Sequence, residues 1–300
     1  MKNVGIAFDN FSGNTGDEAI GISMKEILNS KGVNYTELYP CSNTSKYKPI
    51  IIGGGHLLRE LTSDQTYNQF RIYGPHILNA MGIHGNPMDL DYLNEYQYVS
   101  VRSQGDRNKI NYINNVKITP CTTMLLKDKL DFNYKLSERA VGIHLYPELL
   151  STLEIIQFVE WSKSLIAHGY TIYFIPITMY RNDHESFKPL IRDIGTGSEL
   201  VPAMGALEIF TLIGKLRCMI SYSLHGAIFA YVHNVPFLLS NIYDKNQFFM
   251  EDRGLMKYCF KSISELINTF KTIENMDYSD LIIQDMNTLR EHIYTTCSML

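Results

Sequence analysis

Four ionisable side chains stand at or just beyond points of this sequence where a short apolar strand is expected to end: Asp17, Arg102, His225 and Lys245. An arginine recognises a carboxylate or a phosphate through a fixed, two-pronged set of donors. A histidine titrates near neutral pH, so it can deliver or take up a proton. These residue types together favour acid–base chemistry on a small anionic molecule.

The loop at residues 13–18 reads Gly-Asn-Thr-Gly-Asp-Glu and precedes a predicted helix. Its glycines allow a ligand to approach the backbone, and the first N–H groups of a helix favour an anion. Asn14 and Asp17 are the side chains expected to contact that ligand. No Lys-Ser or Lys-Thr follows, so this is no phosphate-binding P-loop. Taken alone, the loop is better explained as an ordinary strand–helix turn capped by Asp17.

A second glycine run, Gly53, Gly54 and Gly55, follows a predicted buried strand. Three successive glycines exceed the needs of most turns, which favours a ligand packed on bare backbone. Arg102 follows another predicted strand and brings a guanidinium to the same edge of the sheet. One arginine is weak evidence by itself, since it can also pair with a loop carboxylate at the surface.

The stretch around His225 carries the densest set of chemical signals. A strand is expected to turn sharply into an apolar helix, with Ser223 placed to cap it and Leu224 and His225 in its first turn. Lys245 comes after the following strand, and an ammonium beside a histidine at a helix N-terminus suits an anion. A purely structural role, in which His225 bonds the strand–helix corner, stays equally open. His144 ends an earlier strand and is expected to face the ligand.

The elements that must position these side chains alternate in the manner of a parallel α/β sheet. The pattern runs once through the first half and restarts near residue 140. We therefore predict two Rossmann-like domains facing across a cleft, at residues 1–135 and 136–300, with a helical tail on the second. The polar stretch 127–139 is the expected linker, and residues 60–96 are expected to form helix and irregular loop. Predicted strands lie at residues 4–8, 35–38, 49–52, 98–101, 140–145, 171–177, 218–221 and 236–239.

The composition excludes several classes of protein. The 300 residues carry 27 Lys+Arg and 31 Asp+Glu, a net charge of −4, which gives no overall attraction to nucleic acid. The five cysteines are scattered without CxxC spacing, which argues against a disulfide framework and a zinc site. No apolar run approaches the roughly 20 residues of a membrane span, and no signal peptide is recognised, so we expect a cytoplasmic protein. No GxGxxG follows any strand, which disfavours a dinucleotide-dependent dehydrogenase.

Taken in order, these segments resemble the polysaccharide pyruvyl transferase family, over roughly residues 1 to 255. Each segment is short, and the order of the segments makes the resemblance specific. It is carried by Gly13-Asn14-Thr15-Gly16-Asp17-Glu18-Ala19, Ile52-Gly53-Gly54-Gly55, Val101-Arg102-Ser103, Leu224-His225-Gly226, and Val235-Pro236-Phe237 running into Tyr243-Asp244-Lys245.

The resemblance implies a glycosyltransferase-B-like architecture and a transferase that uses phosphoenolpyruvate as donor. Its enolpyruvyl unit would pass to two hydroxyls of a surface-glycan sugar, free or on a lipid-linked oligosaccharide, leaving a cyclic ketal and phosphate. No metal or other cofactor is then expected, and pairing with a second copy of the chain is left open.

The resemblance also implies roles for individual residues. His225, beside Leu224, would protonate the donor's methylene carbon. Arg102 would bind the donor's phosphate or carboxylate, and Lys245 its phosphate. Asp17 would bind the acceptor sugar or act as the base. These roles require Arg102, His225 and Lys245 to converge on one hollow.

Two positions depart from the family pattern. The family usually has Arg two residues before the histidine, where this chain has Ser223, and often Asp after Val-Arg, where it has Ser103. Losing one arginine removes a charge-assisted contact worth about 1.5–3 kcal/mol. Lys215, Arg217 and Arg253 are the substitutes that the sequence offers.

Two other functions remain open at this point. One is a glycosyltransferase of the same architecture that uses a nucleotide-sugar, although no acidic ribose-binding motif stands out in the second half. The other is a non-catalytic glycan-binding paralogue, for which Ser223 is the main argument.

Overall fold

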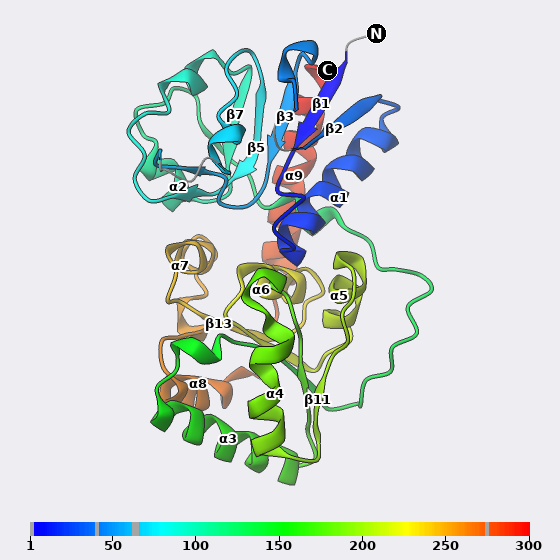
Figure 1. The fold of residues 1–300 in the computed structure, drawn as a ribbon, viewed down its shortest axis with the longest axis vertical. Helices are drawn as coiled ribbons and strands as arrows, with labels where there is room; N and C mark the ends of the chain where they lie inside the picture. Colours follow the sequence, from blue (N-terminus) through cyan, green and yellow to red (C-terminus); the bar gives the residue numbers. More distant parts are fainter. Residues whose placement is uncertain (1–2, 40–41, 62–65, 274–275) are drawn as a thin grey trace. The chain divides into compact units, whose positions relative to one another are not determined.

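The computed structural model describes residues 3–39, 42–61, 66–273 and 276–300. The chain forms two compact units, each built on a six-stranded parallel sheet (Figure 1). The backbone passes from one unit to the other between residues 11 and 12, 16 and 17, 126 and 127, and 282 and 283. Unit 1 comprises residues 1–11, 17–126 and 283–300, and unit 2 comprises residues 12–16 and 127–282.

The sheet of unit 1 has the strand order β2-β1-β3-β5-β7-β8. Its strands are short and mostly buried on both faces, as parallel strands covered by helices are. The strands are β1 (Val4–Ala7), β2 (Tyr35–Leu38), β3 (Ile50–Gly53), β5 (Ile77–Met81), β7 (Tyr98–Val101) and β8 (Lys117–Ile118). Helices α1 (Thr15–Ser30) and α2 (Gln104–Lys109) connect them, and β4 (Leu58–Arg59) pairs with β6 (Ile83–His84) outside this sheet.

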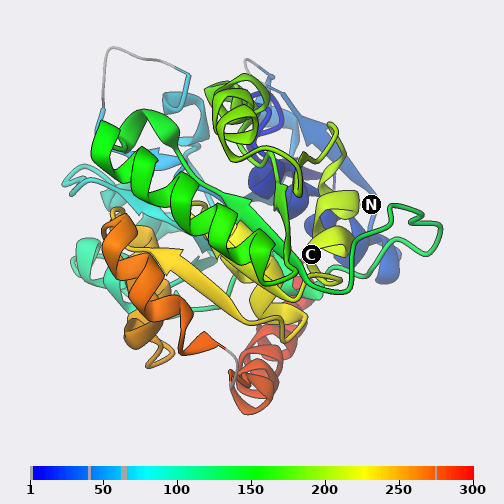
Figure 2. The ribbon, with the colours of Figure 1, turned by 90° about the horizontal axis from the view of Figure 1, so that it is seen from below.

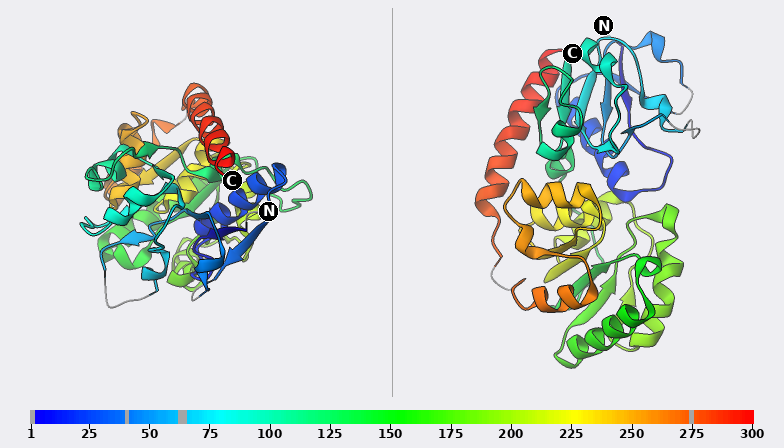
Figure 3. Two further views of the ribbon diagram at one scale, coloured as in Figure 1. Left: turned by 90° about the horizontal axis from the view of Figure 1, so that it is seen from above. Right: turned by 90° about the vertical axis from the view of Figure 1, so that its left-hand side faces the viewer.

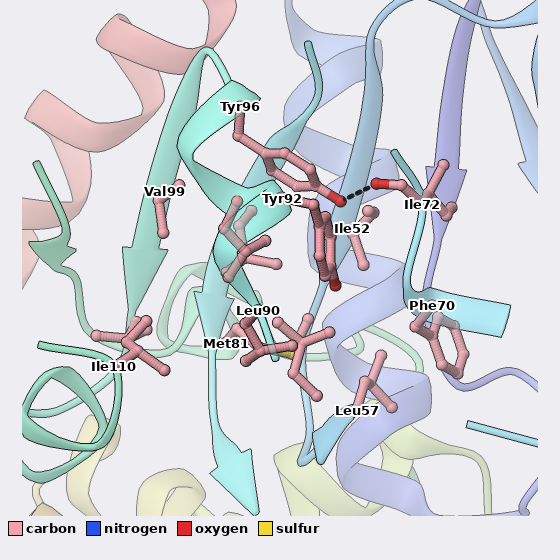
Figure 4. Close-up of a cluster of buried hydrophobic side chains, with 14 of the residues drawn as sticks. Ile52, Leu57, Phe70, Ile72, Met81, Leu90, Tyr92, Tyr96, Val99 and Ile110 are labelled. Carbon is pink, nitrogen blue, oxygen red and sulfur yellow. Dashed lines mark hydrogen bonds between the residues drawn. The ribbon is translucent and has the colours of Figure 1, made fainter. Parts of the chain in front are cut away.

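A cluster of buried apolar side chains fills one side of unit 1, and Figure 4 shows most of its members. The cluster joins strand residues such as Ile52 and Val99 to residues of the long β3–β7 connection, such as Leu57 and Leu90. The Tyr96 hydroxyl donates to the Ile72 carbonyl at 2.5 Å, the dashed contact of Figure 4. Tyr92 and Tyr96 of this connection are therefore core residues.

The prediction of helix and irregular loop for residues 60–96 was wrong in one important respect. Ile77–Met81 is a strand, β5, between β3 and β7. Asn79 interrupts its apolar run, and Ala80 has a positive φ of 47° where the register with β7 shifts. A short strand with a polar centre and an irregularity leaves almost no period-two pattern in the sequence.

The C-terminal helix α9 (Ser279–Ser298) groups with unit 1 from residue 283 onward. The right-hand view of Figure 3 shows it, in red, running beside the strands of that unit. Its His292 Nε2 lies 2.6 Å from the Asn79 Oδ1, and its Nδ1 lies 3.2 Å from the Tyr98 hydroxyl. Burial lowers the pKa of His292 to about 4. The division thus differs from the expected boundaries, which assigned residues 283–300 to the second domain and residues 12–16 and 127–135 to the first.

Unit 2 repeats the pattern, with the strand order β11-β10-β9-β12-β13-β14. Figure 2 shows α3, in green, crossing this sheet with α8, in orange, beside it. The strands are β9 (Ala140–His144), β10 (Thr171–Phe174), β11 (Ser198–Leu200), β12 (Cys218–Ser221), β13 (Phe237–Ser240) and β14 (Cys259–Phe260). The helices are α3 (Thr152–Ala167), α4 (Asp183–Ile194), α5 (Ala206–Ile213), α6 (Leu224–Val232), α7 (Asp244–Glu251) and α8 (Ile263–Phe270).

The strand order of each sheet reverses once, beside β1 in unit 1 and beside β9 in unit 2. Ligands of open α/β sheets bind outside the carboxyl ends of the strands at such a reversal. The predicted class, two Rossmann-like α/β domains, is confirmed. Among the helices that the structure describes, none is both long enough and apolar enough to cross a bilayer.

Candidate functional site

The glycine loop before α1 belongs to unit 2 and is held by the segment that follows β10. The Thr15 amide donates to the Ile177 carbonyl at 3.1 Å, and the Met179 amide donates to the Gly13 carbonyl at 3.2 Å. Between these bonds Asn14 forms an isolated antiparallel bridge with Thr178. The loop is therefore fixed at both ends against one corner of unit 2.

The same loop carries Gly16 to the imidazole of His225. A Cβ atom on Gly16 would lie 1.8 Å from His225 Nδ1 and 2.2 Å from its Cγ, so the ring rests on bare backbone. The Asn14 Oδ1 accepts from the Gly16 amide at 2.9 Å and starts α1, which places Asp17 in the first turn and not at the cap. Glycine is thus required at position 16 because the side chain of His225 approaches the backbone closely there.

His225 lies in the first turn of α6, directly after β12, with 6% of its surface exposed. The corner between strand and helix is tied by Ser221, whose hydroxyl donates to the Ser223 carbonyl at 2.7 Å and accepts from the Ser223 amide at 3.0 Å. Ser223 occupies the cap position, but its side chain makes no capping bond to any described residue. The expected Ser223 cap was therefore wrong, because Ser221 already holds the corner. A Cβ on Gly226 would meet the Ser221 Oγ at 2.5 Å.

His144 is fully buried at the end of β9 and pairs with Asp183, at the start of α4. Its Nε2 lies 3.2 Å from Asp183 Oδ2 and 3.2 Å from Thr178 Oγ1. Asp183 Oδ2 also accepts from the amides of Ile177 and Thr178, at 2.9 and 2.6 Å. Burial opposes ionisation, but these hydrogen bonds prevail and lower the pKa of Asp183. Because an ionised carboxylate only accepts, His144 Nε2 carries the proton.

The His144–Asp183 pair therefore fixes the corner at residues 177–178, on which the glycine loop is docked. His144 was expected to face a ligand. Its Nδ1 is buried and has no hydrogen-bond partner among the described residues. In the structure His144 instead supports the corner on which the glycine loop is docked, and that loop contacts His225.

Lys245 lies in the first turn of α7, half-buried, with its Nζ 5.6 Å from the centre of the Tyr243 ring. Arg181 reaches the same tyrosine, since its Nη2 donates to the Tyr243 hydroxyl at 3.3 Å. The Arg181 guanidinium also stacks 4.3 Å from the centre of the Tyr146 ring and pairs with Glu148 at 2.8 Å. Arg181 was not among the site residues predicted from the sequence. The available signal was its position shortly after the predicted strand at residues 171–177.

Of the three substitutes that the sequence offers for the missing arginine, two make other contacts. Lys215 lies over the Phe132 ring at 4.6 Å, and Arg253 lies over the Phe249 ring at 4.0 Å and donates to the Phe249 carbonyl. Arg217 is exposed.

In unit 1, Asp17 and the glycine run come together beyond the end of β3. A Cβ on Gly55 would lie 2.5 Å from Asp17 Oδ1, so the carboxylate rests on bare backbone there. Gly54 and Gly55 both have positive φ, at 83° and 64°. A Cβ on Gly53 would meet the Met24 Sδ at 2.4 Å, which ties Gly53 to helix packing.

Arg102 and His56 both pack on Gly82, whose amide donates to the Gly55 carbonyl at 2.9 Å. A Cβ on Gly82 would lie 2.4 Å from Arg102 Nη2 and 2.5 Å from His56 Cδ2. Burial raises the pKa of the Cys121 thiol; the charge of Arg102 opposes this rise and that of Asp17 adds to it. Both charges therefore act on one neighbourhood of unit 1. His56 was not among the predicted site residues.

The Arg102 guanidinium is buried but incompletely neutralised. It is 8% exposed, and its Nε lies 3.9 Å from Asp106 Oδ2. Asp106 is held elsewhere, by the Ser103 hydroxyl at 2.5 Å and the Ile83 amide at 2.8 Å. The buried Arg102 Nη2 has no hydrogen-bond partner among the described residues. A buried cation with an unsatisfied donor fits an anionic ligand group.

The described residues contain no group of three or more His, Cys, Asp or Glu side chains arranged to hold a metal ion. The sequence model of the family described as polysaccharide pyruvyl transferase matches residues 14–241, more than half of the chain. The chain belongs to the polysaccharide pyruvyl transferase family. No curated protein matches the sequence.

Solved structures with other activities share the fold of this pyruvyl transferase family member. The UDP-GlcNAc 2-epimerase of Methanocaldococcus jannaschii has a TM-score of 0.57 at 10% identity, over 92% of this chain and 94% of that chain. A glycosyltransferase from Rickettsia africae has a TM-score of 0.58 at 10% identity, over 99% and 98%. The UDP-GlcNAc 2-epimerase of Neisseria meningitidis has 0.53 at 11%, over 95% and 99%. At such identities the likeness establishes a glycosyltransferase-B-type fold alone.

Within this family member the structure brings together two groups of predicted residues. Unit 1 joins Asp17, Gly55 and Arg102, and unit 2 joins His225 to the glycine loop around Asn14. Leu224 is buried in the first turn of α6. Arg102 belongs to unit 1, whereas His225 and Lys245 belong to unit 2. The convergence of these three residues on one hollow therefore stays a prediction.

Proposed function

We propose that this protein transfers the enolpyruvyl group of phosphoenolpyruvate to two hydroxyls of a sugar, forming a pyruvate ketal. The observation that carries the proposal is the seat of His225, a buried imidazole at a helix N-terminus against Gly16, in a chain of the pyruvyl transferase family. A histidine in such a place is well defined in position and can donate a proton in a low-dielectric setting.

The proposed reaction needs one proton donor, one base and a leaving phosphate. His225 delivers a proton to the methylene carbon, which makes the adjacent carbon electrophilic. One sugar oxygen bonds to that carbon, and the second displaces phosphate from it. One hydroxyl proton replaces the proton that His225 gave up and the other leaves with the phosphate, so phosphoenolpyruvate and a diol give ketal and hydrogen phosphate. Asp17, whose carboxylate rests on Gly55, is our candidate for the base or for a sugar contact.

The donor's negative charge requires cationic partners. Arg102 is supported in this role by its burial and its unsatisfied Nη2. Lys245, at the start of α7, is our candidate for a second phosphate contact. Arg181 is our candidate for the positive charge that Ser223 does not supply, because it shares Tyr243 with Lys245. No metal or other cofactor enters this scheme.

Two alternatives have their own support. The fold neighbours include UDP-GlcNAc 2-epimerases, which supports a nucleotide-sugar enzyme as second candidate. Ser223 supports a glycan-binding protein without activity. Both are separated from the main proposal by the products formed.

The decisive experiment incubates the protein with phosphoenolpyruvate and a panel of glycosides and follows phosphate release and ketal formation by mass spectrometry. We expect release that depends on the sugar, and its loss in His225→Ala. His168→Ala, at an exposed histidine that ends α3, is the matched control and should retain activity. Release of a nucleoside diphosphate from a nucleotide-sugar, without ketal formation, contradicts the proposal.

A further inference from the structure

Unit 1 contains a cavity of about 490 Å³ that none of the candidate site residues described above lines. The last residues of β1 and β2 close one side of it, and two connecting segments, at residues 42–45 and 68–73, close the other. Its volume falls within the roughly 300–1,000 Å³ typical of small-molecule sites. The polar and aromatic groups of its lining include Tyr39, Ser42, Thr44, Ser45, Asn68, Gln69, Phe70, Arg71 and Tyr73.

The walls combine aromatic rings with neutral hydrogen-bonding groups. Tyr39 and Tyr73 are 60% and 69% exposed, and the Tyr73 ring packs on one side against the Tyr92 ring, with ring centres 4.7 Å apart. Phe70 is buried and stacks on Phe11, with ring centres 6.4 Å apart and planes 12° apart, which stiffens the wall. Hydroxyls and carboxamides such as those of Ser45 and Asn68 complete the lining. Ring faces with neutral donors and acceptors are the chemistry that binds the C–H faces and hydroxyls of a sugar.

The charge of the cavity decides between a neutral and an anionic ligand. Among the described lining residues Arg71 is the one that carries a full charge at neutral pH. Its Nη1 and Nη2 lie 2.9 and 3.0 Å from the two carboxylate oxygens of Asp89. Its Nη1 also donates to the Asp89 carbonyl and its Nη2 to the Arg59 carbonyl. A guanidinium engaged in this way has little left for a phosphate or carboxylate.

Arg102 shows the contrast within the same unit. Its Nη2 is buried and unsatisfied among the described residues, as an anion site requires, whereas Arg71 is engaged by a carboxylate on both nitrogens. We propose that the cavity at the ends of β1 and β2 is a binding site for a neutral saccharide. If the proposed pyruvyl transfer is correct, the saccharide bound here is the acceptor glycan. Only this assignment rests on the proposed function.

The test measures saccharide binding without phosphoenolpyruvate, by titration calorimetry and saturation-transfer NMR. The probes are neutral methyl glycosides and disaccharides of glucose, galactose, mannose and N-acetylglucosamine, beside glucuronic acid and glucose 6-phosphate. We expect at least one neutral saccharide to bind, and the charged probes to bind more weakly. Preference for a charged probe, or no binding of any neutral one, overturns the proposal.

Variants assign the binding to this cavity. Tyr39→Ala should weaken binding by about tenfold, because it removes one stacked ring. Tyr39→Phe keeps the ring and should stay within about twofold of the parent. Asn68→Ala should also weaken binding, and Tyr294→Ala, at a tyrosine of α9 that is 78% exposed and does not line the cavity, should leave it unchanged. Tyr39 is mostly exposed, so its variants should fold, which thermal denaturation checks.

The outcomes for the two proposals are separable. Binding that Tyr39→Ala weakens, in a protein that never releases phosphate, supports the cavity and contradicts the transferase. Phosphate release with a saccharide KM that Tyr39→Ala and Asn68→Ala leave unchanged supports the transferase and contradicts the cavity as its acceptor site, while direct binding that these variants leave unchanged contradicts the cavity itself. Hydrogen exchange of the peptide over residues 66–73 gives an independent readout, since it should slow when the saccharide binds.

Discussion

The imidazole of His225 rests on the α-carbon of Gly16, in a space that any larger residue would have to share. Gly16 lies in the first turn of α1, where alanine is ordinarily the better helix former. The glycine therefore costs helix stability and is kept by the ring beside it. This relationship connects the first glycine loop of the sequence to the residue proposed to deliver the proton.

Gly16→Ala should displace the His225 ring, because the added methyl group would lie 1.8 Å from Nδ1. Overpacking of this kind costs about 1–3 kcal/mol of stability, and a small misplacement of a reacting group costs on the order of 100-fold in rate. Urea denaturation and phosphate release measure the two effects. Gly205→Ala is the control, since its new Cβ would meet only Glu208 Oε2, at 3.8 Å. Parent-like activity in Gly16→Ala would show that the seat of the ring is irrelevant.

Asp183→Asn should loosen the corner that holds the glycine loop. The carboxylate accepts from two amides, a hydroxyl and His144, and the amide group of Asn places donors where acceptors are needed. We expect a loss of roughly 1.5–3 kcal/mol of unfolding free energy. Asp193→Asn, at an exposed position of the same helix, is the control and should change little.

The same carboxylate predicts a pH dependence. Its pKa is lower in the folded protein than the ordinary 3.8, so its contribution is complete at neutral pH and is lost as the pH falls below about 3.8 toward the folded value. The free energy of unfolding of Asp183→Asn should therefore fall less steeply than that of the parent protein in this acid range. Equal slopes for the two proteins would contradict the ionised carboxylate.

His292 predicts a second transition at higher pH. Its pKa falls from 6.5 in the unfolded chain to about 4 in unit 1, so the folded state excludes the proton. Stability should be complete above pH 6.5 and decline as the pH falls toward 4, by at most about 3 kcal/mol. Hydrogen exchange of α9 peptides between pH 7 and 4.5 should show this decline. His292→Gln should flatten it, and the exposed His168→Gln should not.

Ser223→Arg restores the arginine that the family usually carries, and Arg181→Met removes the charge proposed to replace it. We expect Arg181→Met to raise the KM for phosphoenolpyruvate by about tenfold, in line with one charge-assisted contact. Arg253→Met, whose guanidinium packs on Phe249, should leave that KM unchanged. A gain of donor affinity in Ser223→Arg, with no loss in Arg181→Met, would mean that Arg181 does not fill the role.

Strands with a mainly apolar sequence were predictable. Residues 98–101 and 218–221 are strands with the predicted bounds, because each is a mainly apolar run between turn signals. Residues 35–38 also form a strand with the predicted bounds, although two of the four residues are polar. β5 was missed because Asn79 stands at its centre. The Oδ1 of that asparagine pairs with His292, a partner more than 200 positions along the chain that no local pattern reveals.

The candidate site was predictable as a set of residue types but not as a set of contacts. Position after a strand identified Arg102 and His225, since parallel strands end at one edge of a sheet. The contacts of His225 with Gly16 and of Arg102 with Gly82 depend on backbone geometry, which the sequence does not state. Ser221, and not Ser223, holds the strand–helix corner, because its hydroxyl bonds both the carbonyl and the amide of Ser223. The sequence places two serines near this corner but does not show at which of them the strand ends.

Residues 12–16 are counted with unit 2 although the chain on either side of them belongs to unit 1. A gene fragment encoding only residues 127–282 would therefore lack Gly16, which abuts the imidazole, and Asn14, which forms a bridge with Thr178. We therefore expect such a fragment to form an incomplete unit 2. A chimaera whose first 126 residues come from a relative would place that relative's residues 12–16 in unit 2. Recombination between family members should therefore succeed only where both proteins keep a glycine opposite the histidine.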